Sequence, residues 1–310
     1  MGKIAFLFAG QGAQAPGMGE AFYNASPAAK HIFDAVEAQR PGTIEQCFHG
    51  DAQTLMRTDN TQPCLFATDL ACAAAAVEAG IRADCCAGFS LGELCALYFS
   101  GLFPVLEEVT RLVIVRGEAM QRCNEAHPGA MAAVLKLAPA QVEAICADIE
   151  DAWPVNYNCP GQTVVACAAD KLADVTAAVK AAGGRCMPLK VGGSFHTPRM
   201  APAYRALAEI LPAVNNGSPT MPVYSNYSGG PYRLNECKHW LCEQVSHPVR
   251  WQQILEGMWA DGVDTFIEFG PGTTLAGLVK RTLPGARTAS VCDPESLQKC
   301  LEMMEQEGAQ

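Results

Sequence analysis

The sequence has no long apolar run and fewer basic than acidic residues. A membrane-spanning helix needs about 20 mostly apolar residues, so we expect no membrane segment. The apolar run Ile4–Phe8 is too short for the core of a signal peptide and is typical of a first buried strand. Lysine and arginine number 22 against 32 aspartates and glutamates, a net charge of −10. Nucleic acid is therefore not an expected partner, because phosphate binding needs a basic surface.

Paired cysteine motifs are also absent. The 15 cysteines are an odd number, and no two are spaced as C-x-x-C. Several stand inside apolar runs, for example Cys72 and Cys167, where a free cysteine packs as a small hydrophobic side chain. We therefore expect reduced cysteines, a cytoplasmic location and no metal site.

The sequence does contain a regular alternation of strand and helix patterns. With 310 residues, 49% of them hydrophobic, the chain can form a large domain with an insertion. Strands that alternate with helices are typical of a mainly parallel sheet covered on both faces. Predicted strands are Ile4–Phe8, Ala83–Ala87, Val223–Asn226 and Thr265–Phe269; predicted helices are Pro63–Ala79, Glu93–Phe99, Leu106–Arg122, Pro202–Leu211, Trp251–Asp261 and Thr274–Leu283. The acidic tail Glu302–Gln310 is predicted to fray.

A different rhythm between residues 129 and 191 predicts an inserted lobe. Its strand and helix patterns follow the order βαββαβ, which is typical of a ferredoxin-like unit. The segments are Ala130–Leu137, Pro139–Ile149, Trp153–Asn158, Gln162–Ala168, Asp170–Ala182 and Arg185–Val191. We assign residues 128–193 to an inserted ferredoxin-like subdomain that hinges at Gly192-Gly193. Residues 1–127 and 194–310 then form the large α/β domain.

Residues 88–92, Gly-Phe-Ser-Leu-Gly, match G-x-S-x-G between a predicted strand and a predicted helix. In such an elbow the serine hydroxyl is held clear of the backbone, and the next N–H points to where an oxyanion would form. Ser90 is therefore a candidate nucleophile for an acyl-serine, and the large domain is predicted to have an α/β-hydrolase-like catalytic core. A small-residue turn without chemistry is the alternative that the motif alone leaves open.

A serine hydroxyl needs a base to become a nucleophile. Of the six histidines, His196 lies on a turn at the junction of the two predicted lobes, where a cleft is expected. The acidic residues between Ser90 and His196, such as Asp148 and Asp170, fall largely in the inserted lobe and follow no clear strand end. This pattern argues against an ordinary Ser-Asp-His hydrolase.

Further short motifs are spread over nearly the whole chain. They are Gly10–Gln14, Val115–Gln121, Gly129–Val134, Asn156–Gln162, Phe195–Pro198 with Met200, Gln244 before Pro248–Trp251, and Glu268–Gly272. In this order and spacing, together with the elbow, they resemble the malonyl-CoA:acyl-carrier-protein transacylase family. Any one motif is weak, whereas the whole series is specific. The chain departs from the family pattern at Phe89, where histidine is usual, and at Ala9, where proline is commoner.

The resemblance implies a role for each matching residue of the reaction centre. Ser90 would be the nucleophile and His196 its base. The backbone N–H groups of Gln11 and Leu91 would form the oxyanion hole. A backbone carbonyl at Gln244 would orient the imidazole, which would explain the missing acidic residue.

The resemblance also implies residues that select the acyl group. Arg116 would hold the free malonyl carboxylate, since a guanidinium pairs bidentately with a carboxylate. Met120, one helical turn away, would line the same pocket. Phe195 would crowd an α-methyl branch, and Phe89 and Asn158 would complete the pocket lining.

The implied activity is that of an [acyl-carrier-protein] S-malonyltransferase of fatty-acid or polyketide synthesis. A malonyl group would pass from CoA to the phosphopantetheine thiol of acyl carrier protein through a malonyl-serine. No metal or redox cofactor would be needed, and the chain is expected to act as a monomer. Because such carriers are acidic, docking would need a local basic patch, for which Arg185, Lys190 and Arg199 are candidates.

Two other classes of protein stay open. A thioesterase that acts on acyl-CoA or acyl carriers, or an esterase, would use the same serine. The missing acidic residue and the presence of Arg116 argue against it. A catalytically weak homologue that only binds the carrier protein would be consistent with Phe89 beside the nucleophile. The sequence does not distinguish fatty-acid from polyketide carriers.

Overall fold

The central sheet of the molecule has five strands, all of them parallel to their neighbours. The computed structural model describes residues 2–308. The strand order is β7-β2-β1-β8-β9. The predicted α/β class with a mainly parallel sheet is therefore confirmed. The strands span Lys3–Phe8 (β1), Cys85–Gly88 (β2), Val223–Tyr224 (β7), Val263–Phe269 (β8) and Arg287–Val291 (β9).

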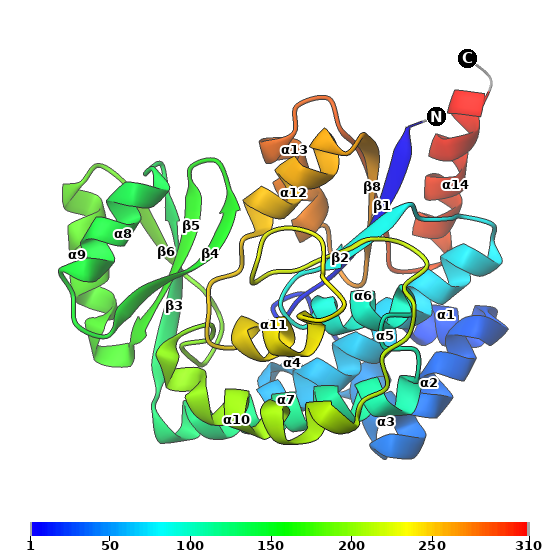
Figure 1. Ribbon diagram of the computed structural model, residues 1–310, viewed down its shortest axis with the longest axis horizontal. Helices are drawn as coiled ribbons and strands as arrows, with labels where there is room; N and C mark the ends of the chain where they lie inside the picture. The colour runs from blue at the N-terminus through cyan, green and yellow to red at the C-terminus, as the bar shows by residue number, and fades with distance from the viewer. Residues whose placement is uncertain (1, 309–310) are drawn as a thin grey trace.

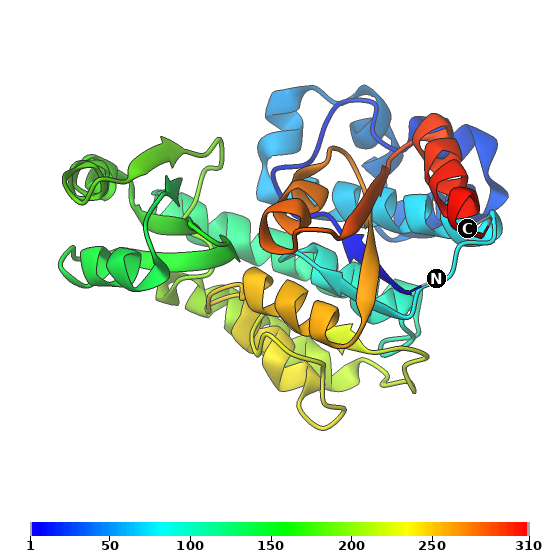
Figure 2. The ribbon, with the colours of Figure 1, turned by 90° about the horizontal axis from the view of Figure 1, so that it is seen from above.

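Helices cover both faces of this sheet (Figure 2). Successive side chains of a strand point to opposite faces. Phe6 and Phe8 of β1 accordingly pack with α5 and α6, whereas Ala5 and Leu7 pack with α12 and α13. Helix α5 is apolar nearly all round and almost wholly buried, as expected for a core helix. The bounds are Thr58–Glu78 (α5), Gly92–Phe99 (α6), Leu106–Ala126 (α7), Trp251–Ala260 (α12) and Thr274–Thr282 (α13).

Several short helices lie where no element was predicted. In α2, the Ser26 hydroxyl accepts a hydrogen bond from the Ala29 N–H at 3.1 Å, and a proline occupies the first helical position. Its apolar residues Ile32, Phe33 and Val36 join the core. The additional helices are Glu20–Ala25 (α1), Pro27–Gln39 (α2), Thr43–His49 (α3), Ala52–Met56 (α4) and Cys237–Gln244 (α11). The helix predicted at Pro202–Leu211 is α10, which spans Ala201–Ile210. Single 3-10 turns span Ala169–Lys171, Pro198–Met200 and Leu211–Ala213.

The predicted fraying of residues 302–310 is wrong over the described part of that tail. Helix α14 spans Pro294–Gly308, and the Asp293 carboxylate accepts the Ser296 N–H at its start at 2.7 Å. Leu297, Leu301 and Met304 are one helical turn apart and pack against the core. This apolar stripe anchors α14 to the core, although many other residues of the helix are polar. Residues 309–310 lie outside the described part of the chain.

The second sheet is small and antiparallel, in the order β4-β5-β3-β6. With α8 and α9 it has the βαββαβ connectivity of a ferredoxin-like unit, as predicted. Figure 1 shows it as a separate green lobe at the left. The elements are Gly129–Leu135 (β3), Pro139–Ala147 (α8), Ala152–Cys159 (β4), Gln162–Ala168 (β5), Leu172–Ala181 (α9) and Arg185–Pro188 (β6).

The small sheet packs on its own helices with one face and on the large domain with the other. Val134 and Val165 belong to the small core with α8 and α9, whereas Ala133 and Val164 join the main core. The Val249 N–H also donates to the Val155 carbonyl of β4 at 2.8 Å. At this junction β4 also contacts α12 and α13, the helices that cover one face of the central sheet.

No helix within residues 2–308 is long and apolar enough to cross a membrane. All 15 cysteines are free. In the same part of the chain, no group of three or more histidine, cysteine, aspartate or glutamate side chains is arranged to hold a metal ion.

Candidate active site

The serine elbow connects β2 to α6 and is held in a strained conformation. Ser90 has a φ of 53°, in the left-handed region that side chains other than glycine rarely adopt. The elbow needs Gly88, because a Cβ there would lie 1.8 Å from the Gly92 carbonyl carbon. The side chain of Asn226 clamps the turn, since it accepts the Ser90 N–H and donates to the Gly88 carbonyl, both at 2.7 Å. These contacts fix the position of the Ser90 hydroxyl.

Ser90 and His196 meet in the folded chain although 106 positions separate them. The Oγ atom of Ser90 lies 2.8 Å from Nε2 of His196, and Nδ1 of His196 lies 2.8 Å from the Gln244 carbonyl oxygen. Because a carbonyl only accepts hydrogen bonds, Nδ1 carries the proton and Nε2 is free to accept one. Burial, and secondly the charge of Arg116, lower the pKa of His196 to about 4. The imidazole is thus a neutral base at pH 7.

Arg116, on α7, reaches the same hydroxyl. Its Nη2 donates to Ser90 Oγ at 3.1 Å and to the Gln244 side-chain oxygen at 3.0 Å, and its Nη1 donates to Gln62 at 2.8 Å. The side chain is 1% exposed, and its Nε has no hydrogen-bond partner. Burial lowers the pKa of Arg116 to about 10, which leaves the guanidinium charged at pH 7. A buried cation next to the nucleophile suits a substrate that brings its own carboxylate.

The backbone N–H groups of Gln11 and Leu91 donate no hydrogen bond within residues 2–308. Leu91 directly precedes α6, and the three N–H groups that follow it, those of Gly92, Glu93 and Leu94, donate to the carbonyls of Phe89, Ser90 and Leu91. Gln11 lies in the turn after β1 and lines the same small cavity as Ser90. Both groups are therefore available to an oxygen that develops negative charge beside the elbow.

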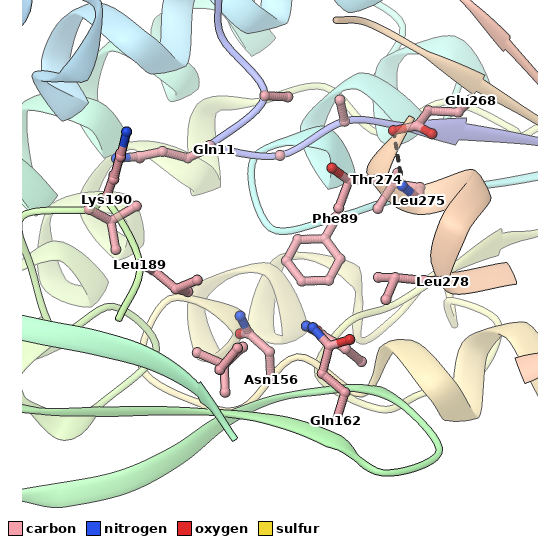
Figure 3. Close-up of a pocket in the computed structure, with 18 residues that line it drawn as sticks. Gln11, Phe89, Asn156, Gln162, Leu189, Lys190, Glu268, Thr274, Leu275 and Leu278 are labelled. Atoms are coloured by element: carbon pink, nitrogen blue, oxygen red, sulfur yellow. Dashed lines mark hydrogen bonds between the residues drawn. The ribbon is translucent and has the colours of Figure 1, made fainter. Parts of the chain in front are cut away.

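Two adjoining cavities open at the junction between the two sheets. A small one, of about 70 Å³, is lined by Ser90, His196, Met120 and Phe195, and a larger one of about 280 Å³ lies next to it. Phe89 lines both, and Figure 3 shows its ring projecting into the larger cavity beside Leu278. The ring also packs edge-on against Trp251, with 5.2 Å between the ring centroids.

The larger cavity carries polar groups without partners. The Oδ1 atoms of Asn156 and Asn158 are buried and accept no hydrogen bond, and both residues line the cavity. Glu268 also lines it, but its carboxylate accepts the Leu275 and Ala276 N–H groups at the start of α13, at 3.0 and 2.8 Å (Figure 3). The two asparagine oxygens therefore have no partner among residues 2–308, whereas the glutamate carboxylate is engaged within the fold.

The site contains buried polar residues that were not predicted. These are Gln62, Glu93 and Asn226, joined by the partly buried Tyr232, and they bond to Arg116, to the elbow or to one another. One of them has a visible signal in the sequence. Glu93 is the single charged residue of the otherwise apolar helix α6. A carboxylate at such a position is either exposed to water or held by polar partners.

Comparison with known proteins establishes the class first. A family model described as an acyl transferase domain matches residues 5–297, so the chain is an acyl transferase by fold and by sequence. It is 37% identical to the malonyl CoA-acyl carrier protein transacylase of Bacillus subtilis strain 168, over 99% of each chain. With that of Escherichia coli K12 it shares 33% identity, over 98% of this chain and 100% of the other. The chain belongs to the malonyl CoA-acyl carrier protein transacylase family.

Solved structures of similar sequence have the same fold. The malonyl CoA-acyl carrier protein transacylase of Clostridium perfringens aligns with a TM-score of 0.94 and 34% identity, over 99% of this chain and 98% of that one. A malonyl-transacylase in complex with a type II PKS acyl-carrier protein aligns with a TM-score of 0.92 and 32% identity, over 97% and 99%.

Proposed function

We propose that this chain transfers a malonyl group from malonyl-CoA to the phosphopantetheine thiol of an acyl carrier protein, through a malonyl ester on Ser90. The main support is that one hydroxyl, Ser90 Oγ, has a neutral imidazole at 2.8 Å and a buried guanidinium at 3.1 Å. The first activates a nucleophile, and the second suits an acyl group that ends in a carboxylate.

The first half-reaction follows from this geometry. Ser90 Oγ attacks the thioester carbon while His196 Nε2 takes the hydroxyl proton, and the carbonyl oxygen becomes an oxyanion held by the N–H groups of Gln11 and Leu91. The intermediate collapses with cleavage of the C–S bond. His196 gives its proton to the departing CoA sulfur. The products are CoA and malonyl-Ser90.

The second half-reaction runs the same steps in reverse with a different thiol. His196 removes the proton of the phosphopantetheine thiol, and its sulfur attacks the ester carbon of malonyl-Ser90. The C–O bond breaks, and the proton returns to Ser90 Oγ. The Gln244 carbonyl keeps the imidazole oriented in both directions, because it accepts the Nδ1–H throughout. The mechanism assigns no step to a metal or redox cofactor.

The small cavity suits a short unbranched acyl group. Arg116, whose Nη2 reaches Ser90 Oγ, would bind the malonyl carboxylate, while Met120 and Phe195 line the cavity walls. Phe195 is buried and lines this cavity, so an α-methyl branch would meet its ring. One methyl group contributes about 1–3 kcal/mol to discrimination in such a pocket.

The larger cavity suits the pantetheine arm, whose amides would find the free oxygens of Asn156 and Asn158. Lys190 lies at this cavity, and Arg185 lies on the edge strand β6, so we propose both for contact with an acidic carrier. Arg199 is less suited, because it pairs with Asp151 at 2.7 Å and stacks on Trp153.

The proposal also covers the division of the chain into domains. Residues 1–127 and 194–310 would form the catalytic domain, and residues 128–193 the inserted subdomain. All proposed site residues come from one chain, which supports action as a monomer. The free and mostly buried cysteines support a reducing, cytoplasmic location.

The decisive experiment follows the malonyl group. The protein is incubated with malonyl-CoA alone and then with an added holo acyl carrier protein, and intact-protein mass spectrometry follows both proteins. We expect a malonyl adduct on Ser90 that moves to the carrier. Ser90→Ala should form no adduct. Rapid release of free malonate without malonyl-carrier would instead identify a thioesterase, and no adduct at all would indicate a protein that only binds the carrier.

A further inference from the structure

Glu93 is a fully buried carboxylate three positions after the nucleophile. Its Oε1 accepts the Asn226 N–H at 3.1 Å and the Tyr232 hydroxyl at 2.5 Å, and its Oε2 accepts the Gln244 side-chain amide at 2.8 Å. A buried ionised carboxylate is strongly unfavourable unless hydrogen bonds or a counter-charge compensate for the lost water. The mechanism described above gives Glu93 no part.

The Gln244 side chain connects Glu93 to the reaction centre. Its Nε2 donates to Glu93 and, at 2.6 Å, to the Ser90 carbonyl, while its Oε1 accepts Arg116 Nη2 at 3.0 Å. An amide can be placed either way round. Two acceptors on one side and a guanidinium on the other allow only one placement here, so the carboxylate of Glu93 helps to turn the amide oxygen toward Arg116.

Arg116 has no direct acidic partner within residues 2–308. Its ordered donors go to the neutral oxygens of Gln62, Gln244 and Ser90. Glu93 is the nearest carboxyl group along this hydrogen-bond chain. Burial raises the pKa of Glu93 to about 7, while its hydrogen bonds with Tyr232, Gln244 and Asn226, and then the charge of Arg116, favour the ionised form. This arrangement compensates the buried cation and still leaves it open to a carboxylate of the substrate.

We propose that Glu93 is a positioning residue for acyl selection: acting through the Gln244 amide, it holds the Arg116 guanidinium beside Ser90. The same glutamine orients His196 with its backbone carbonyl, so one residue connects the base to the carboxylate clamp. The inference rests on the proposed binding of the malonyl carboxylate by Arg116. Glu93 itself does not touch the substrate.

The test is a selectivity measurement on Glu93→Gln in the full chain. The kcat and KM values are determined for malonyl-CoA and acetyl-CoA with the same carrier protein. We expect a raised KM for malonyl-CoA and a fall of about tenfold in the malonyl-to-acetyl ratio of kcat/KM, which corresponds to about 1.4 kcal/mol. A purely structural role would lower both kcat/KM values by one factor and leave the ratio unchanged, and that result would overturn the proposal.

Two further variants control the experiment. Glu118→Gln removes the same charge from α7, but its side chain is 52% exposed and faces Arg122, so we expect no change in the ratio. Should Glu93→Gln not fold, Glu93→Asp keeps the charge but shortens the reach to Gln244, and a folded Glu93→Asp with wild-type selectivity would equally contradict the proposal. A wild-type protein that forms no malonyl adduct would instead contradict the proposed function.

Discussion

The Nη2 atom of Arg116 lies 3.1 Å from the Oγ atom of Ser90, so the cation that suits a substrate carboxylate touches the nucleophile itself. Arg116 lies on α7, whereas Ser90 lies on the elbow between β2 and α6. Before the acyl group arrives, Arg116 is held by the neutral oxygens of Gln62 and Gln244. The clamp is therefore ordered in advance, which reduces the entropy lost when the acyl group binds.

Arg116→Ala should shift acyl preference from malonyl toward acetyl. A hydrogen bond to a charged group contributes about 1.5–3 kcal/mol, so kcat/KM for malonyl-CoA should fall by at least about tenfold. The value for acetyl-CoA should change much less. A competition assay with both thioesters measures the ratio directly, and a ratio equal to that of the wild type would remove Arg116 from its proposed role. Arg116→Lys retains the charge without the planar fork and should recover part of the preference.

The acid limb of the pH profile should lie below the ordinary histidine range. The proposed base is neutral His196, whose pKa is lowered to about 4 by burial and by Arg116. The kcat/KM value reports ionisations of the free enzyme, so it should stay high as the pH falls through 6.5 and decline only nearer pH 4. Acetyl-CoA is the control substrate, because it has no carboxylate to protonate. An acid midpoint near 6.5 with acetyl-CoA would contradict a buried neutral base.

The same shift has a consequence for stability. Between about pH 6.5 and 4 the unfolded chain binds a proton at His196 that the folded chain does not. The contribution of this residue to the free energy of unfolding should therefore fall as the pH falls through that window.

Gly88→Ala should destabilise the elbow and abolish activity. The added Cβ would lie 1.8 Å from the backbone of Gly92, which must then move away from the Ser90 turn. Overpacking of this kind costs about 1–3 kcal/mol, measurable as a lower midpoint in denaturant. Gly230→Ala is the matched control, since no atom beyond its chain neighbours lies within 4 Å of a Cβ there. It should keep activity and gain up to about 1 kcal/mol from the stiffer unfolded chain. Equal effects at both positions would show that the close approach at Gly88 is not what the elbow requires.

The fold was predictable where pattern and packing agree. Strands such as Thr265–Phe269 are short apolar runs beside helical patterns, and the order βαββαβ is visible along the chain. The prediction of a frayed tail was wrong because residues 302–310 are mostly polar. The helix is held by Leu297, Leu301 and Met304, and their role becomes visible only in their contact with the core. Helix α2 was missed although the Ser26 cap and its apolar spacing are local signals.

The residues of the site also divide into those that the sequence indicated and those that it did not. Ser90 stands in a local motif, and the resemblance to a family pointed to Gln11, Arg116, His196 and Gln244. Glu93 was missed because its role depends on hydrogen bonds with Asn226, Tyr232 and Gln244, which lie more than 130 positions away in the chain. No periodicity reports such a contact.

By itself, the sequence determined the serine elbow and the alternation of strand and helix patterns, including the order βαββαβ, because each of these patterns is set by residues close together in the chain. Only the tertiary structure decided that Arg116 and His196 meet at one hydroxyl, that Gln244 contacts both of them, and that the buried carboxyl group of Glu93 lies behind Gln244. Those relationships arise from burial. Once water is excluded, most buried polar groups are paired with groups from whatever part of the chain the fold brings near.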